Sequence, residues 1–181
     1  MAEHDNVFGI TKRMIRDIMN LSSAYAKHIK KDFDEHEISI SNKSLSELLS
    51  KIIEVYSSKI FTEKLGYRVE KEKSDREPDL VFTRMNRPLE VKVTSTNSGW
   101  TGGEFSRRAP DYLLVSWGEN FDEFFVALVH IEKSDWESRI EKRFYGPFFS
   151  IKRLYDIKQK TIFVGNLERK GERTKLLRER I

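Results

Sequence analysis

The sequence contains no cysteine, only 4 prolines and 9 glycines among 181 residues, and no long hydrophobic run. The absence of cysteine excludes disulfide bonds, zinc–thiolate sites and thiol catalysis. The longest uninterrupted apolar run, from Phe124 to Val129, is far too short to cross a bilayer. The acidic start, Met1 to Asp5, is followed by no long apolar segment. We therefore expect no signal peptide, no membrane partner and a cytoplasmic protein.

Several enzyme motifs are also missing. The sequence has no GxxxxGK[ST], which argues against a P-loop NTPase. It has no GxSxG, no HExxH and no EF-hand loop. We expect no ATP-driven enzyme and no nucleotide cofactor.

What the chain does contain is charge, with 34% charged and 38% hydrophobic residues. These fractions and the length favour a single folded domain spanning 1–181. Residues 131–181 hold 14 Lys/Arg and 8 Asp/Glu, whereas the first 130 residues hold 19 and 21. A basic C-terminal third suggests a polyanionic partner. A solvated surface explains the charge equally well.

Two short apolar runs, 79–83 and 89–95, are joined by a polar segment rich in turn-forming residues. This pattern predicts a β-hairpin. The first run begins with Asp79, and the second contains Glu90 and Lys92. Side chains two residues apart on a strand point to the same face, so Glu90 and Lys92 should point together. The hairpin should also bring Asp79 beside Glu90.

Two neighbouring carboxylates repel each other unless a cation lies between them. Oxygen ligands with open positions suit Mg²⁺, which keeps several waters and accepts phosphate oxygens as further ligands. Such a metal activates water and neutralises charge on a phosphodiester under attack. A lysine ammonium beside it can orient the attacking water. The alternative is an exposed strand face with an ordinary salt bridge, worth at most about 1 kcal/mol.

Pro78-Asp79, ten intervening residues and then Glu90-Val91-Lys92 resemble the PD-(D/E)xK nuclease superfamily, which includes many type II restriction endonucleases. The resemblance implies that Asp79 and Glu90 bind Mg²⁺ and that the Val91 carbonyl adds a ligand. It implies that Lys92 serves the nucleophilic water.

The resemblance also implies an α/β fold with a restriction-endonuclease-like core, a central mixed β-sheet flanked by α-helices. This core would cover residues 44–131. Residues 1–43 would form an added helical N-terminal extension, and 132–181 a basic C-terminal segment.

Hydrophobic periodicity predicts two long helices ahead of the hairpin. The first covers 6–37, either as one helix or as two broken near Ser22-Ser23. The second begins at Ser44, with Ser44 and Glu47 as a capping box, and ends at Gly66.

The nuclease core often carries a further catalytic glutamate on its first helix, and the resemblance implies Glu54. A helical wheel argues the other way, because it puts Glu54 roughly opposite the apolar stripe and Glu63 on it. On resemblance we expect Glu54 to assist catalysis, with a solvated Glu54 as the alternative.

The segment 95–108 has no apolar period and contains three glycines and many hydroxyls. It leaves the end of the strand that carries Glu90 and Lys92, so we interpret it as a DNA-contacting loop rather than an ordinary surface loop. The expected DNA contacts are Ser95, Asn97, Trp100, Arg107 and Arg108.

Beyond this loop, 112–117 and 124–131 look like an antiparallel strand pair. Residues 135–143 suggest a short helix, Gly146-Pro147 a turn and 161–165 an edge strand. The charged tail 168–180 should be disordered or become ordered on DNA. We expect His130, which lies at a strand end, to be structural.

Together these features predict a Mg²⁺-dependent endodeoxyribonuclease, most consistent with a type II restriction enzyme that cuts double-stranded DNA as a homodimer. A Holliday-junction or repair-type nuclease is one alternative. A DNA-binding protein without catalysis is another.

Overall fold

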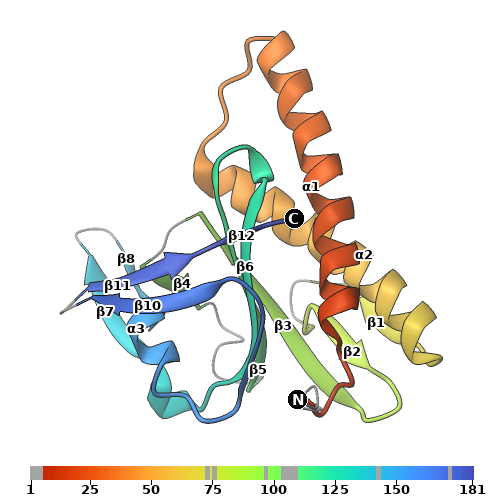
Figure 1. Ribbon diagram of the computed structural model, residues 1–181, viewed down its shortest axis with the longest axis vertical. Helices are drawn as coiled ribbons and strands as arrows, with labels where there is room; N and C mark the ends of the chain where they lie inside the picture. The colour runs from red at the N-terminus through yellow and green to blue at the C-terminus, as the bar shows by residue number, and fades with distance from the viewer. Residues whose placement is uncertain are drawn as a thin grey trace.

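A computed structural model describes residues 6–71, 74, 77–95, 98–102, 110–141, 144–170 and 173–181, and shows two long helices followed by β-structure (Figure 1). The helices are α1 (Lys12–Glu35), α2 (Asn42–Leu65) and α3 (Ile151–Leu154). The strands are β1 (Val69–Lys71), β2 (Leu80–Phe82), β3 (Arg87–Thr94), β4 (Gly99–Thr101), β5 (Asp111–Trp117), β6 (Glu123–His130), β7 (Glu137–Glu141), β8 (Phe144–Ser150), β9 (Lys160–Val164), β10 (Asn166–Lys170), β11 (Arg173–Leu177) and β12 (Glu179–Arg180).

The central sheet has the strand order β1-β2-β3-β5-β6-β12, and β9 also pairs with β6. Strands β3 and β5 run parallel, in a register that puts Glu90 opposite Tyr112 and Lys92 opposite Leu114. The other pairs of this sheet are antiparallel. The predicted α/β class with a mixed central sheet is therefore confirmed.

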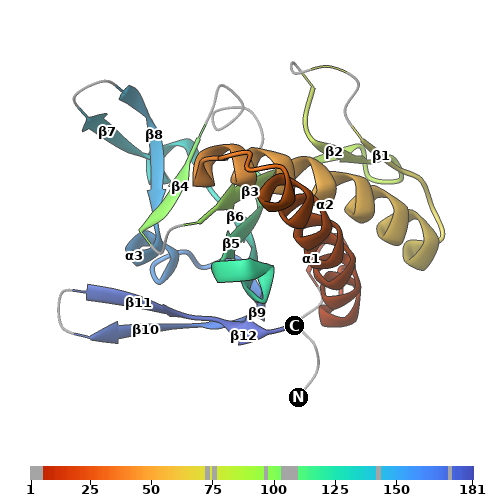
Figure 2. The same cartoon turned by 90° about the horizontal axis from the view of Figure 1, so that it is seen from above.

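The sheet separates two hydrophobic clusters. The larger cluster joins α1 and α2 to one face, and it includes Val91, Leu113 and Val115. The smaller cluster lies on the other face, where Tyr112 and Leu114 contact β4, β8 and α3. Figures 1 and 2 show the long helices on one side of the sheet and β4, β7, β8 and α3 on the other. Since side chains alternate along β3, Glu90 and Lys92 belong to the face opposite the helix-packed one.

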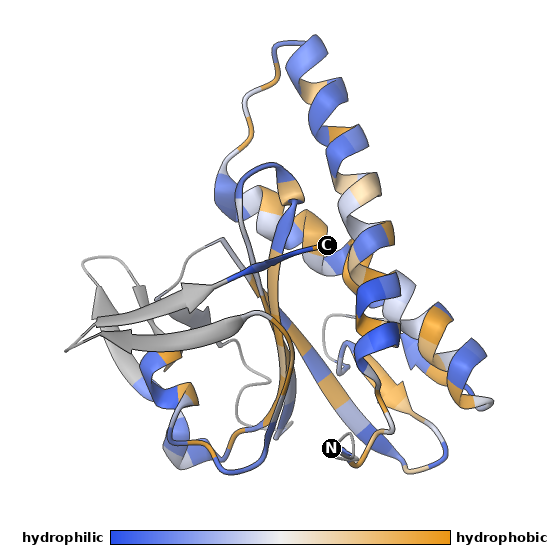
Figure 3. Cartoon of the chain, viewed as in Figure 1, coloured by the Kyte–Doolittle hydropathy of each residue, from blue (hydrophilic) through white to orange (hydrophobic). Residues whose placement is uncertain are grey.

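Both long helices start at a side-chain cap. α1 is one continuous helix, with Thr11 as its N-cap. The N-cap of α2 is Ser41, whose Oγ accepts a hydrogen bond from the backbone N–H of Ser44 at 3.1 Å. The predicted start at Ser44 is therefore wrong, because Ser41 satisfies the first turn three residues earlier. The predicted end is confirmed, since Gly66 adopts the left-handed conformation at φ 72°. Figure 3 shows hydrophobic and hydrophilic residues alternating along these helices.

The C-terminal third contains more β-structure than the sequence indicated. The predicted helix at 135–143 is wrong, because β7 and β8 form an antiparallel pair there that includes Gly146 and Pro147. Of the two alternatives for the tail 168–180, disorder is wrong for its described residues, because β10 and β11 form a hairpin and β12 adds to the sheet. Aromatic side chains of β8 favour a strand, and pairing with a distant partner decides the outcome. The predicted edge strand at 161–165 is confirmed as β9.

Glu179 of β12 forms ion pairs with α1, at 3.5 Å to Lys12 and 3.8 Å to Arg16.

Within the described parts of the chain, no helix combines the length and apolar character that a membrane crossing requires.

Candidate active site

The predicted hairpin forms the centre of the candidate site. Strands β2 and β3 pair in antiparallel register, with Leu80 opposite Leu89. The next position outward puts Asp79 opposite Glu90. Directly opposed residues of an antiparallel pair point to the same face. The hairpin therefore brings the two acids together, as the sequence predicted, although they are eleven positions apart.

The Asp79 carboxylate is buried and accepts a hydrogen bond from the backbone N–H of Val91, with Oδ2 at 2.7 Å. This contact lies beyond the last ladder pair of β2 and β3. The N–H and C=O of one strand residue point to the same edge. The Val91 carbonyl therefore points to the edge of β3 at which the Asp79 carboxylate lies.

Glu90 is 1% exposed, and its two carboxylate oxygens have different surroundings. Oε2 lies 3.1 Å from the Nζ of Lys92. Oε1 is buried and has no hydrogen-bond partner in the described part of the protein. Burial raises the pKa of Glu90 to about 7, because the attraction of Lys92, which lowers it, is outweighed by burial together with the neighbouring Asp79, which repels the ionised form and favours a shared proton.

These contacts make the Asp79–Glu90 pair a site that either holds a proton or attracts a cation. A buried carboxylate oxygen without a donor is costly, and a second carboxylate beside it adds repulsion. Both costs would be relieved by a divalent cation at the pair. Among the residues that the structure describes, no three His, Cys, Asp or Glu side chains converge to hold a metal. A metal here would thus have two carboxylates and a backbone oxygen as protein ligands.

Lys92 connects this pair to an open cavity of about 570 Å³. The cavity lies between the first turns of α2 and the second half of β3, and Thr101 of β4 also contributes. Its lining includes Val91, Lys92 and Ser95 from the β3 side and Lys43 and Ser50 from α2. Asp79 and Glu90 do not line it, so Lys92 and Val91 are the residues through which the acids meet it.

Glu54 is buried, at 1% exposure, and its carboxylate contacts the Nζ of Lys51 at 3.1 Å and the Oγ of Ser50 at 3.3 Å. The helical wheel prediction of a solvated Glu54 is wrong, because α2 is buried over a wide arc that also includes Ser57. Glu63, which the wheel put on the apolar stripe, is exposed and pairs with a neighbouring lysine. Since Ser50 lines the cavity with Lys92, Glu54 lies one helical turn from it.

The predicted DNA contacts have different outcomes. Ser95 lines the cavity, and its contact with DNA stays a prediction. Asn97, Arg107 and Arg108 lie outside the described residues. The prediction for Trp100 is corrected: its indole is 1% exposed, and its Nε1–H donates to the Val115 carbonyl at 2.8 Å. A buried ring cannot stack on a base, so Trp100 serves the core instead.

Part of the supposed loop is also ordered as β4, which pairs with β8. This pairing explains the burial of Trp100, since β8 and the smaller cluster cover it.

A polar network around the buried Asp111, which the sequence did not reveal, lies at the start of β5, beside the Glu90–Tyr112 pair. Asp111 accepts two hydrogen bonds from Arg87, at 2.6 and 3.0 Å, and its Oδ1 lies 2.9 Å from Nδ1 of His130. The Nε2 of His130 lies 2.9 Å from Glu132. The bond to Asp111 raises the pKa of His130. The network links β3, β5 and β6, and no local pattern could indicate contacts 24 and 19 residues apart.

The structure thus brings Asp79, Glu90, Val91 and Lys92 together, with Ser95 on the adjoining cavity. No protein-family model matches the sequence, and neither does any curated protein. The case for a particular chemistry therefore rests on the geometry of these residues.

Proposed function

We propose that this protein is a Mg²⁺-dependent endodeoxyribonuclease that cleaves double-stranded DNA, and more specifically that it is a type II restriction enzyme. One observation carries the proposal: Asp79 and Glu90 are opposed across a hairpin, with Lys92, which lines a cavity, 3.1 Å from Glu90. In the same proposal the mixed sheet is a restriction-endonuclease-like core, and β2 and β3 are its catalytic strands.

The residues present fit a magnesium ion. Mg²⁺ prefers oxygen ligands and usually takes one or two carboxylates, leaving other positions to water and phosphate. Asp79, Glu90 and the Val91 carbonyl would hold it, and the unpartnered Oε1 of Glu90 is the atom that gains most. When bound, the ion would supply a Lewis acid that activates water and offsets charge on a phosphodiester.

Lys92 and Asp79 have separate roles in this proposal. The Nζ of Lys92 lies 3.1 Å from the buried Glu90, its side chain is 21% exposed, and Lys92 belongs to the lining of the open cavity. It positions the attacking water and stabilises developing negative charge. The hydrogen bond from Val91 N–H to Asp79 fixes that carboxylate relative to β3. The acids are thereby held in place before substrate binds.

The surroundings of the site fit a DNA strand. Lys43 and Lys92 line the same cavity, and phosphate contacts are commonly made by lysine, serine and backbone N–H groups. A homodimer would put two such sites on a twofold axis and cut both strands.

The test is incubation of plasmid DNA with Mg²⁺ and, separately, with EDTA. Discrete fragments indicate a restriction enzyme, a smear an unspecific nuclease, and cleavage of branched DNA alone a junction or repair enzyme. A retarded but intact band indicates a binder without catalysis and refutes the proposal. Asp79→Ala should abolish cleavage and leave DNA affinity largely intact, whereas the exposed control Asp156→Ala should cut normally. Mg²⁺-dependent cleavage retained in Asp79→Ala would exclude the assigned role.

A further inference from the structure

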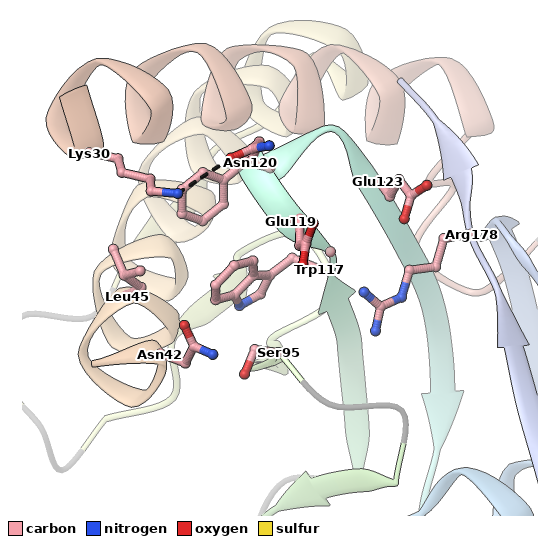
Figure 4. A pocket seen from close by; sticks show the side chains of 11 residues that line it. Lys30, Asn42, Leu45, Ser95, Trp117, Glu119, Asn120, Glu123 and Arg178 are labelled. Atoms are coloured by element: carbon pink, nitrogen blue, oxygen red, sulfur yellow. Dashed lines mark hydrogen bonds between the residues drawn. The ribbon is translucent and has the colours of Figure 1, made fainter. Parts of the chain in front are cut away.

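A second cavity, of about 810 Å³, lies between the long helices and the turn that joins β5 to β6 (Figure 4). It is lined by Lys30 of α1, Asn42 of α2, Trp117 and Asn120 around the turn, and Arg178 next to β12. Its volume is in the range of ordinary small-molecule sites. The lining is polar except for the Trp117 indole and the side chains of Leu45 and Phe121.

Ser95 joins this cavity to the candidate active site, because it lines both cavities. It follows Lys92 by three residues, which is roughly 10 Å along an extended strand. A DNA strand advances about 3.4 Å per nucleotide in a duplex. A strand with one phosphate at Lys92 would therefore have a nucleotide about three positions away at the second cavity.

Arg178 is suited to bind a phosphate there. Its guanidinium is half-buried and donates from Nη2 to the Oγ of Ser116 at 3.0 Å. Among the described residues it forms no ion pair within 4.0 Å, although Glu123 is near enough to influence it. A guanidinium carries five N–H donors, of which one binds Ser116 here, and a phosphate can accept two parallel hydrogen bonds from an arginine.

The turn leaves room for this arginine. A Cβ on Gly118 would lie 2.9 Å from Nη1 of Arg178 and 2.9 Å from Oε2 of Glu123. The next residues of the turn include Asn120 and Phe121, which have φ values of 56° and 57°. Two consecutive non-glycine residues in the left-handed region cost free energy, and such strain concentrates at binding sites.

The opposite part of the cavity offers groups for a base. Trp117, at 6% exposure, forms only a rigid wall, because its ring stacks on Phe121 at 4.7 Å and its Nε1–H donates to the Oγ of Ser46 at 2.9 Å. Asn120 accepts from Lys30 at 3.3 Å through Oδ1, which leaves its amide N–H groups for a ligand. The Asn42 amide can both donate and accept at a base edge.

Two carboxylates also line the cavity, Glu119 and Glu123, so its charges balance against Lys30 and Arg178. The cavity therefore has no net positive charge that would attract a polyanion in general. Carboxylates accept hydrogen bonds from exocyclic amino groups of bases, as in Glu or Asp contacts to cytosine. Thymine has no such group, which predicts discrimination against it.

We propose that this cavity is a nucleotide subsite, which binds one nucleotide of a DNA strand with Arg178 on the phosphate and the carboxylate and amide groups on the base. The inference rests on the proposed nuclease function for its biological context. The binding itself requires neither a metal nor cleavage.

The test is calorimetric titration with the four deoxynucleoside 5′-monophosphates and with inorganic phosphate, in EDTA. We expect dAMP, dCMP and dGMP to bind more tightly than dTMP and phosphate. Arg178→Gln and the exposed Asn42→Ala should each weaken binding, the former about tenfold or more. The control Arg180→Gln removes the same charge two residues away, outside the lining, and should bind like the unaltered protein.

Three results would overturn the subsite: no nucleotide binding at millimolar concentration, equal affinity for phosphate alone, or unaltered affinity in Arg178→Gln. Circular dichroism of each variant separates loss of binding from loss of folding. Because no cleavage is measured, nucleotide binding without nuclease activity would reject the proposed function alone. Cleavage of DNA without nucleotide binding would reject the subsite alone.

Discussion

Replacing Glu90 with glutamine should make the protein more stable at alkaline pH. The pKa of Glu90 is about 7 in the folded protein, against an ordinary value of 4.5. The folded state thus binds this proton more tightly than the unfolded chain does. The stabilisation that results is fully present below pH 4.5 and is lost as the pH rises to about 7.

The magnitude follows from the difference between the two pKa values. At about 1.36 kcal/mol per pH unit, the unaltered protein should lose on the order of 3 kcal/mol of its free energy of unfolding across this window. Glu90 is 1% exposed, so solvent screening removes little of this effect. Glutamine cannot ionise, and its amide can donate to Asp79. Glu90→Gln should therefore keep this part of its free energy of unfolding across the pH window.

Urea denaturation in EDTA, from pH 4.5 to pH 8.5, measures the free energy of unfolding of the unaltered protein and of Glu90→Gln. The difference between the unaltered protein and Glu90→Gln should grow with pH and level off above pH 7. Other groups, including His130 with its raised pKa, titrate in both proteins. Their contributions therefore cancel when one free energy of unfolding is subtracted from the other at each pH. Glu63→Gln, at an exposed position, should follow the unaltered protein at every pH. If the free energies of unfolding of Glu90→Gln and of the unaltered protein change with pH in parallel, Glu90 does not have a raised pKa in the folded protein.

Three further predictions concern neighbouring groups. Lys92→Met should lower the cleavage rate by about 10²–10⁴-fold, the usual contribution of a positioned proton-transfer or charge-stabilising group, while DNA affinity in EDTA changes little; unchanged cleavage would remove Lys92 from the mechanism. Glu54→Gln should slow cleavage of plasmid DNA more than Glu63→Gln does, and equal rates would leave Glu54 a structural residue. Asp111→Ala removes the carboxylate that Arg87 and His130 share, and should lower the free energy of unfolding by about 3–5 kcal/mol in urea titrations; a loss below 1 kcal/mol would show that the network contributes little.

The hairpin was predictable because its signals are local. Two short apolar runs around a polar turn define β2 and β3, and alternation along β3 puts Glu90 and Lys92 on one face. The end of α2 was equally local, since Gly66 follows directly after the helical period. Where neighbouring residues in the sequence decide the conformation, the sequence was sufficient to predict the structure.

The errors have a common physical origin in contacts between distant segments. Burial of Trp100 depends on β4 pairing with β8, some fifty residues later. Burial of Glu54 depends on the wide packing surface of α2, which a single apolar stripe does not describe. Arg178 looked like part of a charged tail, and only the pairing of β12 with β6 brings it to a cavity. Each error is a case in which tertiary structure overrides a local preference.

The position of β6 has a consequence for synthesis of the protein. This strand is almost entirely buried between three described partner strands, of which β5 precedes it and β9 and β12 follow it in the chain. While a ribosome is still translating those later segments, β6 exposes an apolar strand edge to the nascent chain's surroundings. Exposed edges of this kind recruit other strands. Slower translation, or depletion of chaperones that hold unfinished chains, should therefore increase the insoluble fraction of newly made protein.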